Sequence, residues 1–109
     1  MENSRTVGTG AYLSAKTLTN QEIEQRIETS DEWIISRTGT RSRFVAAENE
    51  RASDLALHAS RGAMDAAGVT ADDVDLIVLA ISTPDMISPS KACLLQQKLG
   101  VTRGAAFDV

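Results

Sequence analysis

The feature that most restricts the fold is an unbroken apolar run over residues 76–81, which directly follows Asp75. The run is too short for a typical isolated helix and rich in β-branched side chains, so it predicts a strand. Apolar residues at every position, rather than at alternate ones, indicate a strand covered on both faces. A parallel sheet flanked by helices is the architecture in which such strands occur.

Helix signals stand on both sides of this strand. Ser53 is expected to cap a helix that continues to residue 67 and ends at a glycine. Ser88, followed by proline, is expected to start another helix that reaches residue 99 and also ends at a glycine. The apolar segment 104–109 then begins a further buried strand. Alternating strands and helices indicate right-handed βαβ units of the α/β class.

The first half of the sequence predicts shorter elements. Residues 6–13 combine β-branched and aromatic side chains with glycines, which suggests a first strand. Thr19 and Glu22 have the spacing of a capping box, with a helix expected to reach about residue 28. Ser30 is expected to cap a second short helix that ends at a glycine, and an exposed strand or hairpin arm is expected at 40–46.

The composition of the chain argues against several classes of function. A chain of 109 residues is one domain or part of one, and its net charge of −4 provides no overall basic field for nucleic acid. No apolar run is long enough to span a bilayer and the N-terminus has no secretion signal, so a cytoplasmic location is the default expectation. With one cysteine and one histidine, no metal site built from these ligands is expected.

The tryptophan and a cluster of arginines each have a structural and a functional interpretation. A tryptophan such as Trp33 is more often a packing residue than a platform for a ligand. Arg37, Arg41 and Arg43 form a short basic cluster, which is usually a solvated face rather than a phosphate site. The residues alone leave both interpretations open.

A structural role, rather than a functional one, is favoured for the thiol of Cys93 and the imidazole of His58. Cys93 lies within a predicted amphipathic helix, where a lone cysteine is usually a small buried hydrophobe rather than a nucleophile. His58 has no acidic or thiol partner at ligand spacing, so a surface or partly buried role is expected. The acidic residues 72–75 lack the spacing and glycine of a calcium loop, and helix capping explains them better.

Four segments together carry a family resemblance: GTGAYL at 8–13, TSDEWIISRTGTRSR at 29–43, the Ser-Pro-Ser-x-Ala-Cys pattern at 88–93 and GAAFDV at 104–109. In this order and spacing they resemble the start of beta-ketoacyl-acyl carrier protein synthase III, a thiolase-like condensing enzyme. The resemblance covers nearly the whole chain. It implies the N-terminal part of a layered αβαβα fold with a mixed, mostly parallel sheet.

The most specific of these segments implies a ligand site. By the resemblance, Thr29, Trp33, Arg37 and Thr38 lie at the mouth of a pantetheine tunnel and bind coenzyme A. Trp33 would stack on the adenine, and Arg37 would bind phosphate through charge-assisted hydrogen bonds. The motif therefore favours the functional interpretation of Trp33 and Arg37.

The resemblance also implies where the acyl pocket and the catalytic residues of the enzyme lie. Ser82 and Ser88 are candidates for the acyl pocket, and serine at 88, where some members carry a bulky aromatic residue, would leave room for a longer acyl group. The nucleophilic cysteine is expected shortly after Val109, and the family's histidine and asparagine later still. Residues 1–109 would then form an incomplete domain without catalytic residues or metal, inactive by itself.

The implied reaction uses no cofactor, with coenzyme A thioester as substrate. The full-length enzyme would take an acyl group from acyl-CoA onto cysteine and condense it with malonyl-acyl carrier protein to start fatty acid synthesis, as a homodimer. A ketosynthase or acyltransferase of secondary metabolism, or a non-catalytic fragment that binds coenzyme A, are the alternatives. Acyl chain length and the acceptor are left open by these residues.

Overall fold

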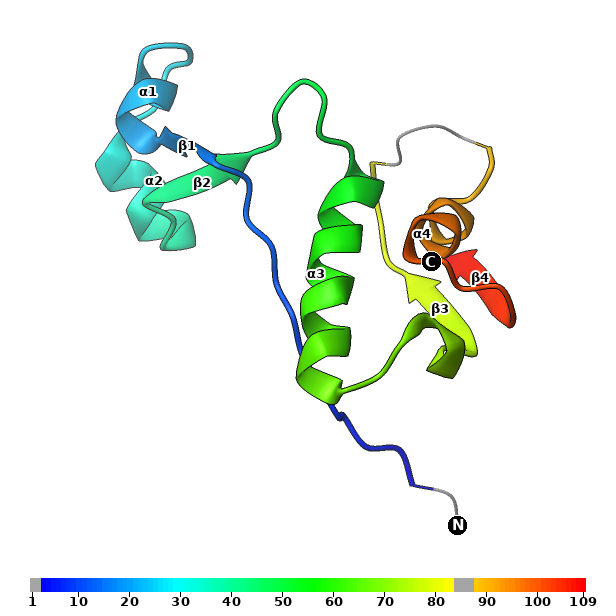
Figure 1. The fold of residues 1–109 in the computed structure, drawn as a ribbon. Helices are drawn as coiled ribbons and strands as arrows, with labels where there is room; N and C mark the ends of the chain where they lie inside the picture. Colours follow the sequence, from blue (N-terminus) through cyan, green and yellow to red (C-terminus); the bar gives the residue numbers. More distant parts are fainter. Residues whose placement is uncertain (1–2, 84–87) are drawn as a thin grey trace. The chain divides into compact units, whose positions relative to one another are not determined.

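The chain forms two compact units in the computed structural model, which describes residues 3–83 and 88–109 (Figure 1). The smaller unit is Leu13–Asn49, and the larger unit combines the residues up to Tyr12 with Glu50–Val109. Both units mix helices with a two-stranded sheet. Each unit is best understood from its own contacts.

The smaller unit is a two-stranded sheet with two short helices between its strands. Its elements in chain order are β1 (Lys16–Thr19), α1 (Asn20–Glu24), α2 (Asp31–Thr38) and β2 (Ser42–Val45). The strands are antiparallel, with Lys16 opposite Val45 and Thr19 opposite Ser42. The predicted exposed strand at 40–46 is therefore confirmed, as one arm of this pair.

The predicted capping box at the start of α1 is confirmed, but the helix is shorter than expected. The Glu22 amide donates to Thr19 Oγ1 over 3.3 Å, and the Thr19 amide donates to Glu22 Oε2 over 2.7 Å. These hydrogen bonds satisfy amides that the helical ladder leaves free at its start. The helix stops at Glu24 rather than near residue 28, because the amides of Arg26 and Ile27 both donate to the Ile23 carbonyl and form a turn.

The larger unit contains the parallel sheet that the apolar run predicted. Its elements in chain order are α3 (Ala52–Ala67), the 3-10 helix η1 (Ala71–Asp73), β3 (Leu76–Leu79), α4 (Lys91–Leu99) and β4 (Ala105–Asp108). Strands β3 and β4 are parallel, with Leu76 beside Ala105 and Leu79 beside Asp108. Helix α4 connects them, which makes a βαβ unit.

The core of this unit lies between the sheet and α4. Ile77 of β3 packs with Ala92 and Leu95 of α4 and with Val101, and all four side chains are buried. On the other face of β3, Leu76 is 56% exposed and Val78 is 52% exposed. The prediction of a strand covered on both faces is therefore wrong for the described residues, in which α4 covers only the Ile77 side.

The first strand predicted at 6–13 is absent, because this segment pairs with no other strand in the described structure. It lies instead against α3, with its glycines at the contact. A Cβ atom at Gly10 would lie 2.3 Å from the Ala59 carbonyl oxygen, and one at Gly8 would lie 2.5 Å from the Ala63 carbonyl oxygen. The two glycines therefore permit a close backbone approach, which is one of the roles of glycine in an extended segment.

Both serine caps predicted in the second half are displaced. Helix α3 begins at Ala52, two residues earlier than a helix capped by Ser53 would, and the Arg51 amide at its N-cap donates to Asp54 Oδ2 over 3.0 Å. Ser53 is buried, and its hydroxyl accepts from Lys98 Nζ over 2.7 Å. Helix α4 is capped by Ser90 rather than Ser88, since Ser90 Oγ accepts from the Cys93 amide.

The acidic residues before β3 cap a helix, as expected. The Thr70 amide donates to Asp73 Oδ2 over 2.8 Å at the start of η1, and this hydrogen bond lowers the pKa of Asp73 below its ordinary value. Within residues 3–83 and 88–109, no three histidine, cysteine or acidic side chains gather as a metal site would require. No helix among these residues combines the length and apolar character needed to cross a membrane.

Candidate functional site

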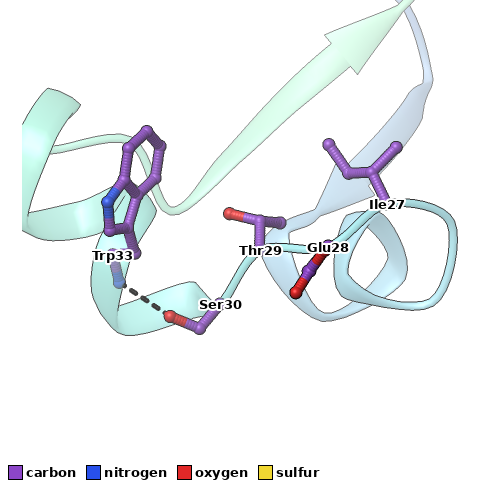
Figure 2. A pocket seen from close by; sticks show the side chains of 5 residues that line it. All are labelled: Ile27, Glu28, Thr29, Ser30 and Trp33. Atoms are coloured by element: carbon purple, nitrogen blue, oxygen red, sulfur yellow. Dashed lines mark hydrogen bonds between the residues drawn. The ribbon is translucent and has the colours of Figure 1, made fainter.

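The candidate site is an open pocket in the smaller unit, at the connection between α1 and α2 (Figure 2). It encloses about 440 Å³ and is lined by a continuous stretch together with one residue of the next helix: Ile27, Glu28, Thr29, Ser30 and Trp33. In Figure 2 the indole of Trp33 stands at one end and Ile27 at the other, and the Thr29 hydroxyl points toward the indole. The pocket thus has an apolar side chain at each end and the polar side chains of Glu28, Thr29 and Ser30 between them.

The start of α2 fixes the position of Trp33. Ser30 Oγ accepts a hydrogen bond from the Trp33 amide over 3.1 Å, as the predicted cap requires. Gly39 ends the helix in the left-handed conformation, with φ of 71°, which is also as predicted. The Trp33 side chain remains 56% exposed at the first turn of a helix that is fixed at both ends.

A guanidinium lies beside the indole. Arg37 follows Trp33 by one helical turn, and its Cζ is 6.0 Å from the centroid of the Trp33 ring. At this distance the cation is attracted by the electron-rich face of the ring. The pair therefore presents an aromatic surface and a cation together.

A buried amide holds the helices and the strand of this unit together. Asn20 is fully buried, and its Nδ2 donates to Asp31 Oδ1 and to the Thr40 carbonyl oxygen, both over 2.7 Å. Its Oδ1 accepts from Arg43 Nη2 over 2.9 Å. One side chain thus connects the start of α2, the segment between α2 and β2, and an arginine of β2. Buried polar groups satisfied in this way specify a single arrangement of the backbone.

Two glutamates brace the loop that leads to the pocket. The backbone and side-chain hydrogen bonds from Thr19 hold the pKa of Glu22 below its ordinary value, because they favour the ionised carboxylate. The Glu24 carboxylate accepts from the Asp31 amide at the start of α2. The pocket residues 27–30 therefore lie between two anchored points.

The structure brings three of the four predicted coenzyme A residues together. Thr29 and Trp33 line the pocket, and Arg37 lies beside Trp33. Thr38 is different: its hydroxyl donates to the Ile34 carbonyl oxygen over 2.8 Å and accepts from the Thr40 amide over 3.1 Å. It does not line the pocket, and its hydroxyl stabilises the end of α2.

Sequence reasoning missed Glu28 as a pocket residue. Glu28 directly precedes Thr29, and its side chain lines the same pocket (Figure 2). The available signal was its place beside the motif, but an exposed glutamate between two helices is ordinary on any protein surface. Asn20 was missed for a similar reason, since nothing in its neighbours marks it as buried.

The other sequence candidates lie elsewhere. Ser82 and Ser88, the acyl-pocket candidates, are both exposed and flank residues 84–87, which lie outside the described residues. Their role in an acyl pocket stays a prediction. Arg43, expected on a solvated face, is partly buried and bonded to Asn20. It is a structural residue of this unit.

Cys93 and His58 belong to the larger unit. Cys93 is exposed, with its Sγ 3.8 Å from the Ala106 carbonyl oxygen, so the expectation of a buried thiol is wrong. The buried face of α4 is formed instead by Ala92 and Leu95. His58 is exposed, as expected, and stacks on Tyr12 with ring centroids 4.6 Å apart.

Comparison with known proteins gives a consistent relationship. The chain is 57% identical, over 97% of its length, to a beta-ketoacyl-acyl carrier protein synthase III of Xanthomonas oryzae, and covers 33% of that protein. The solved synthase III of Aquifex aeolicus superposes with a TM-score of 0.88 and 41% identity, over 94% of this chain and 33% of that one. No family model matches the chain.

A polyketide enzyme has a similar fold. The priming beta-ketosynthase of the R1128 polyketide pathway superposes with a TM-score of 0.90 and 32% identity, over 96% of this chain and 31% of that one.

The chain spans about a third of the length of the curated relatives it matches. The motifs, the βαβ unit and the matches to the sequence and the structure all lead to one family. Over the residues it contains, the chain is similar to beta-ketoacyl-acyl carrier protein synthase III in sequence and has the thiolase-like α/β fold of the solved synthase III.

Proposed function

We propose that this chain forms the coenzyme A entrance of a condensing enzyme that starts fatty acid synthesis, as the N-terminal part of a longer cytoplasmic homodimer. The whole enzyme would transfer an acyl group from acyl-CoA to a cysteine and condense it with malonyl-acyl carrier protein. The observation that carries the proposal is the exposed indole of Trp33, which lies beside Thr29 in the pocket with the Arg37 guanidinium next to its ring.

The chemistry of the pocket suits a nucleotide. Aromatic side chains bind bases by stacking, and a flat indole that is already held in place loses little conformational entropy when a base covers it. Guanidinium groups bind phosphate through directed, charge-assisted hydrogen bonds. Coenzyme A joins an adenine to phosphates, so Trp33 and Arg37 would bind adjoining parts of the same ligand.

The residues of this chain would act by binding and orientation. In the proposed reaction, a cysteine thiolate outside these residues attacks the thioester carbonyl, and coenzyme A leaves as the free thiol after taking up a proton. Malonyl-acyl carrier protein then loses carbon dioxide, and the carbanion attacks the acyl-cysteine to form a β-ketoacyl product and regenerate the thiol. Binding of the nucleotide at the entrance aims the pantetheine arm and its thioester inward.

The first test separates binding from chemistry. In the intact protein, Trp33→Ala should raise KM for acyl-CoA by about fivefold or more with kcat nearly unchanged, because base stacking is worth about 1–3 kcal/mol. Phe44→Ala is the matched control, since Phe44 is an exposed aromatic of β2 that does not line the pocket. Steady-state kinetics with both variants measures the effect. An unchanged KM in Trp33→Ala would argue against the entrance.

A priming ketosynthase of polyketide synthesis is the second candidate. The similarity to the R1128 enzyme, with its TM-score of 0.90, favours it, and the two enzyme types would share the same entrance. Ser82 and Ser88 would then help to set the acyl primer. Comparing the intact protein with fatty acid and polyketide carrier proteins, over acyl-CoA primers of increasing length, distinguishes the two by product.

A further inference from the structure

Side chains of opposite charge precede and follow Trp33 along the chain. Glu28 lines the pocket on the side that precedes α2, and Arg37 lies one turn further along the helix, beside the ring. Within the part of the chain that the structure describes, no hydrogen bond or ion pair engages the Glu28 carboxylate. A ligand that stacks on Trp33 therefore meets a carboxylate in one direction and a guanidinium in the other.

This polarity restricts how a polyanionic ligand can lie. Phosphate groups next to Glu28 would be repelled, whereas beside Arg37 they would be attracted. The base end of the ligand is thus expected on the Glu28 and Thr29 side. A carboxylate in contact with a base requires a hydrogen-bond donor on the edge of that base, because an ionised carboxylate only accepts.

Bases differ in what this edge offers. Adenine carries an exocyclic amino group, which is a donor, whereas hypoxanthine and guanine carry an oxo group, which is an acceptor, at the same ring position. A carboxylate that faces this ring position would accept a hydrogen bond from the amino group of adenine and would be repelled by the oxo group of hypoxanthine or guanine. The Thr29 hydroxyl, which both donates and accepts, can bond a ring nitrogen of either base.

We propose that Glu28 is a specificity-determining residue that accepts a hydrogen bond from the exocyclic amino group of adenine, with the phosphates on the Arg37 side of Trp33. Glu28 thereby selects an adenine nucleotide over one with an oxo group at that position. This inference rests on the proposed function, since it assigns a role within the same entrance. It gives a role to Glu28, which lies outside the motif at 29–43, and it gives the orientation of the bound ligand.

The test compares two ligands that differ only at this group. Binding of coenzyme A and of its hypoxanthine analogue to the intact protein is measured by titration calorimetry. The unsubstituted protein should bind coenzyme A about tenfold or more tightly than the analogue, because an unmet charged acceptor rejects a mismatched ligand strongly. Glu28→Gln should reduce this ratio to about threefold or less, since an amide can turn to offer either a donor or an acceptor.

A matched control and a second variant decide the outcome. Glu32→Gln makes the same change at an exposed residue of α2 that does not line the pocket, and it should keep the full ratio. If Glu28→Gln keeps the ratio while Trp33→Ala weakens both ligands, the role of Glu28 is wrong and the entrance stands. If Trp33→Ala changes the binding of neither ligand, the entrance and the role of Glu28 both fail.

Discussion

Asn20 shows how a single side chain can hold a site that it does not touch. Its amide bonds the Asp31 carboxylate, the Thr40 carbonyl and the Arg43 guanidinium, and it is fully buried. These contacts fix the start of α2, from which Trp33 projects. The backbone that carries the exposed pocket residues is therefore anchored by a buried side chain.

At this scale we predict that Asn20→Asp destabilises the smaller unit by about 2 kcal/mol or more. The change replaces the Nδ2 donor with a charged oxygen that faces the Asp31 carboxylate and the Thr40 carbonyl, and buried polar groups without partners are costly. Gln21→Glu is the matched control, because it makes the same amide-to-acid change at an exposed neighbour. Urea unfolding of both variants gives the comparison, and equal stabilities would contradict the account.

Individual residues were predicted well only where a motif or a local rule applied. Thr29, Trp33 and Arg37 came from the motif, and the structure brings them together. Asn20 and Glu28 depend on which distant segments lie beside them, and no local pattern records that. Cys93 was placed on the wrong face of its helix because a lone cysteine is usually buried, whereas here its neighbour Ala92 takes that position.

Elements were predicted best where their ends have local signals. The capping box at Thr19 and the stop at Gly39 are confirmed, since both depend on residues within one turn. The segment 6–13 shows the opposite case. Its composition indicated a strand, but a strand needs a partner, and among the described residues this segment pairs with no strand and lies against α3.

The contact with α3 leads to a prediction at the element scale. Gly10→Ala should destabilise the larger unit by about 3 kcal/mol or more, because the added Cβ would lie 2.3 Å from the Ala59 carbonyl and 2.4 Å from the Ala63 amide, which are backbone atoms. Gly62→Ala, on the facing helix, should be neutral or stabilising by up to about 1 kcal/mol, because its Cβ would lie 3.7 Å from the nearest atom.

Thermal unfolding of the two glycine variants in the intact protein provides the measurement. Both variants add one methyl group to the same contact between the segment and α3, so they differ in the space available and in the helix propensity that alanine adds at residue 62. A Gly10→Ala protein as stable as the unsubstituted one would show that the segment does not lie against α3 as described.

At the scale of the whole molecule, the two units hold different parts of the proposed function. The smaller unit contains the pocket, and the larger unit contains the parallel sheet. The α/β class was predicted from the apolar run together with the helix signals on both sides of it, because parallel strands alternate with helices in that class. The degree to which the faces of the sheet are covered could not be predicted, since covering depends on residues remote from the run. Among the described residues Leu76 and Val78 are exposed, because α4 covers only the face of β3 that carries Ile77.

The most direct test of the central claim is a crystal structure of the intact protein with coenzyme A. We predict that the adenine stacks on the indole of Trp33, with its amino group toward Glu28 and the phosphates of coenzyme A toward Arg37. Thr29 should contact the base, while Thr38 should keep its hydrogen bond to the Ile34 carbonyl. Coenzyme A bound with its adenine away from Trp33 would contradict the claim that this chain forms the entrance.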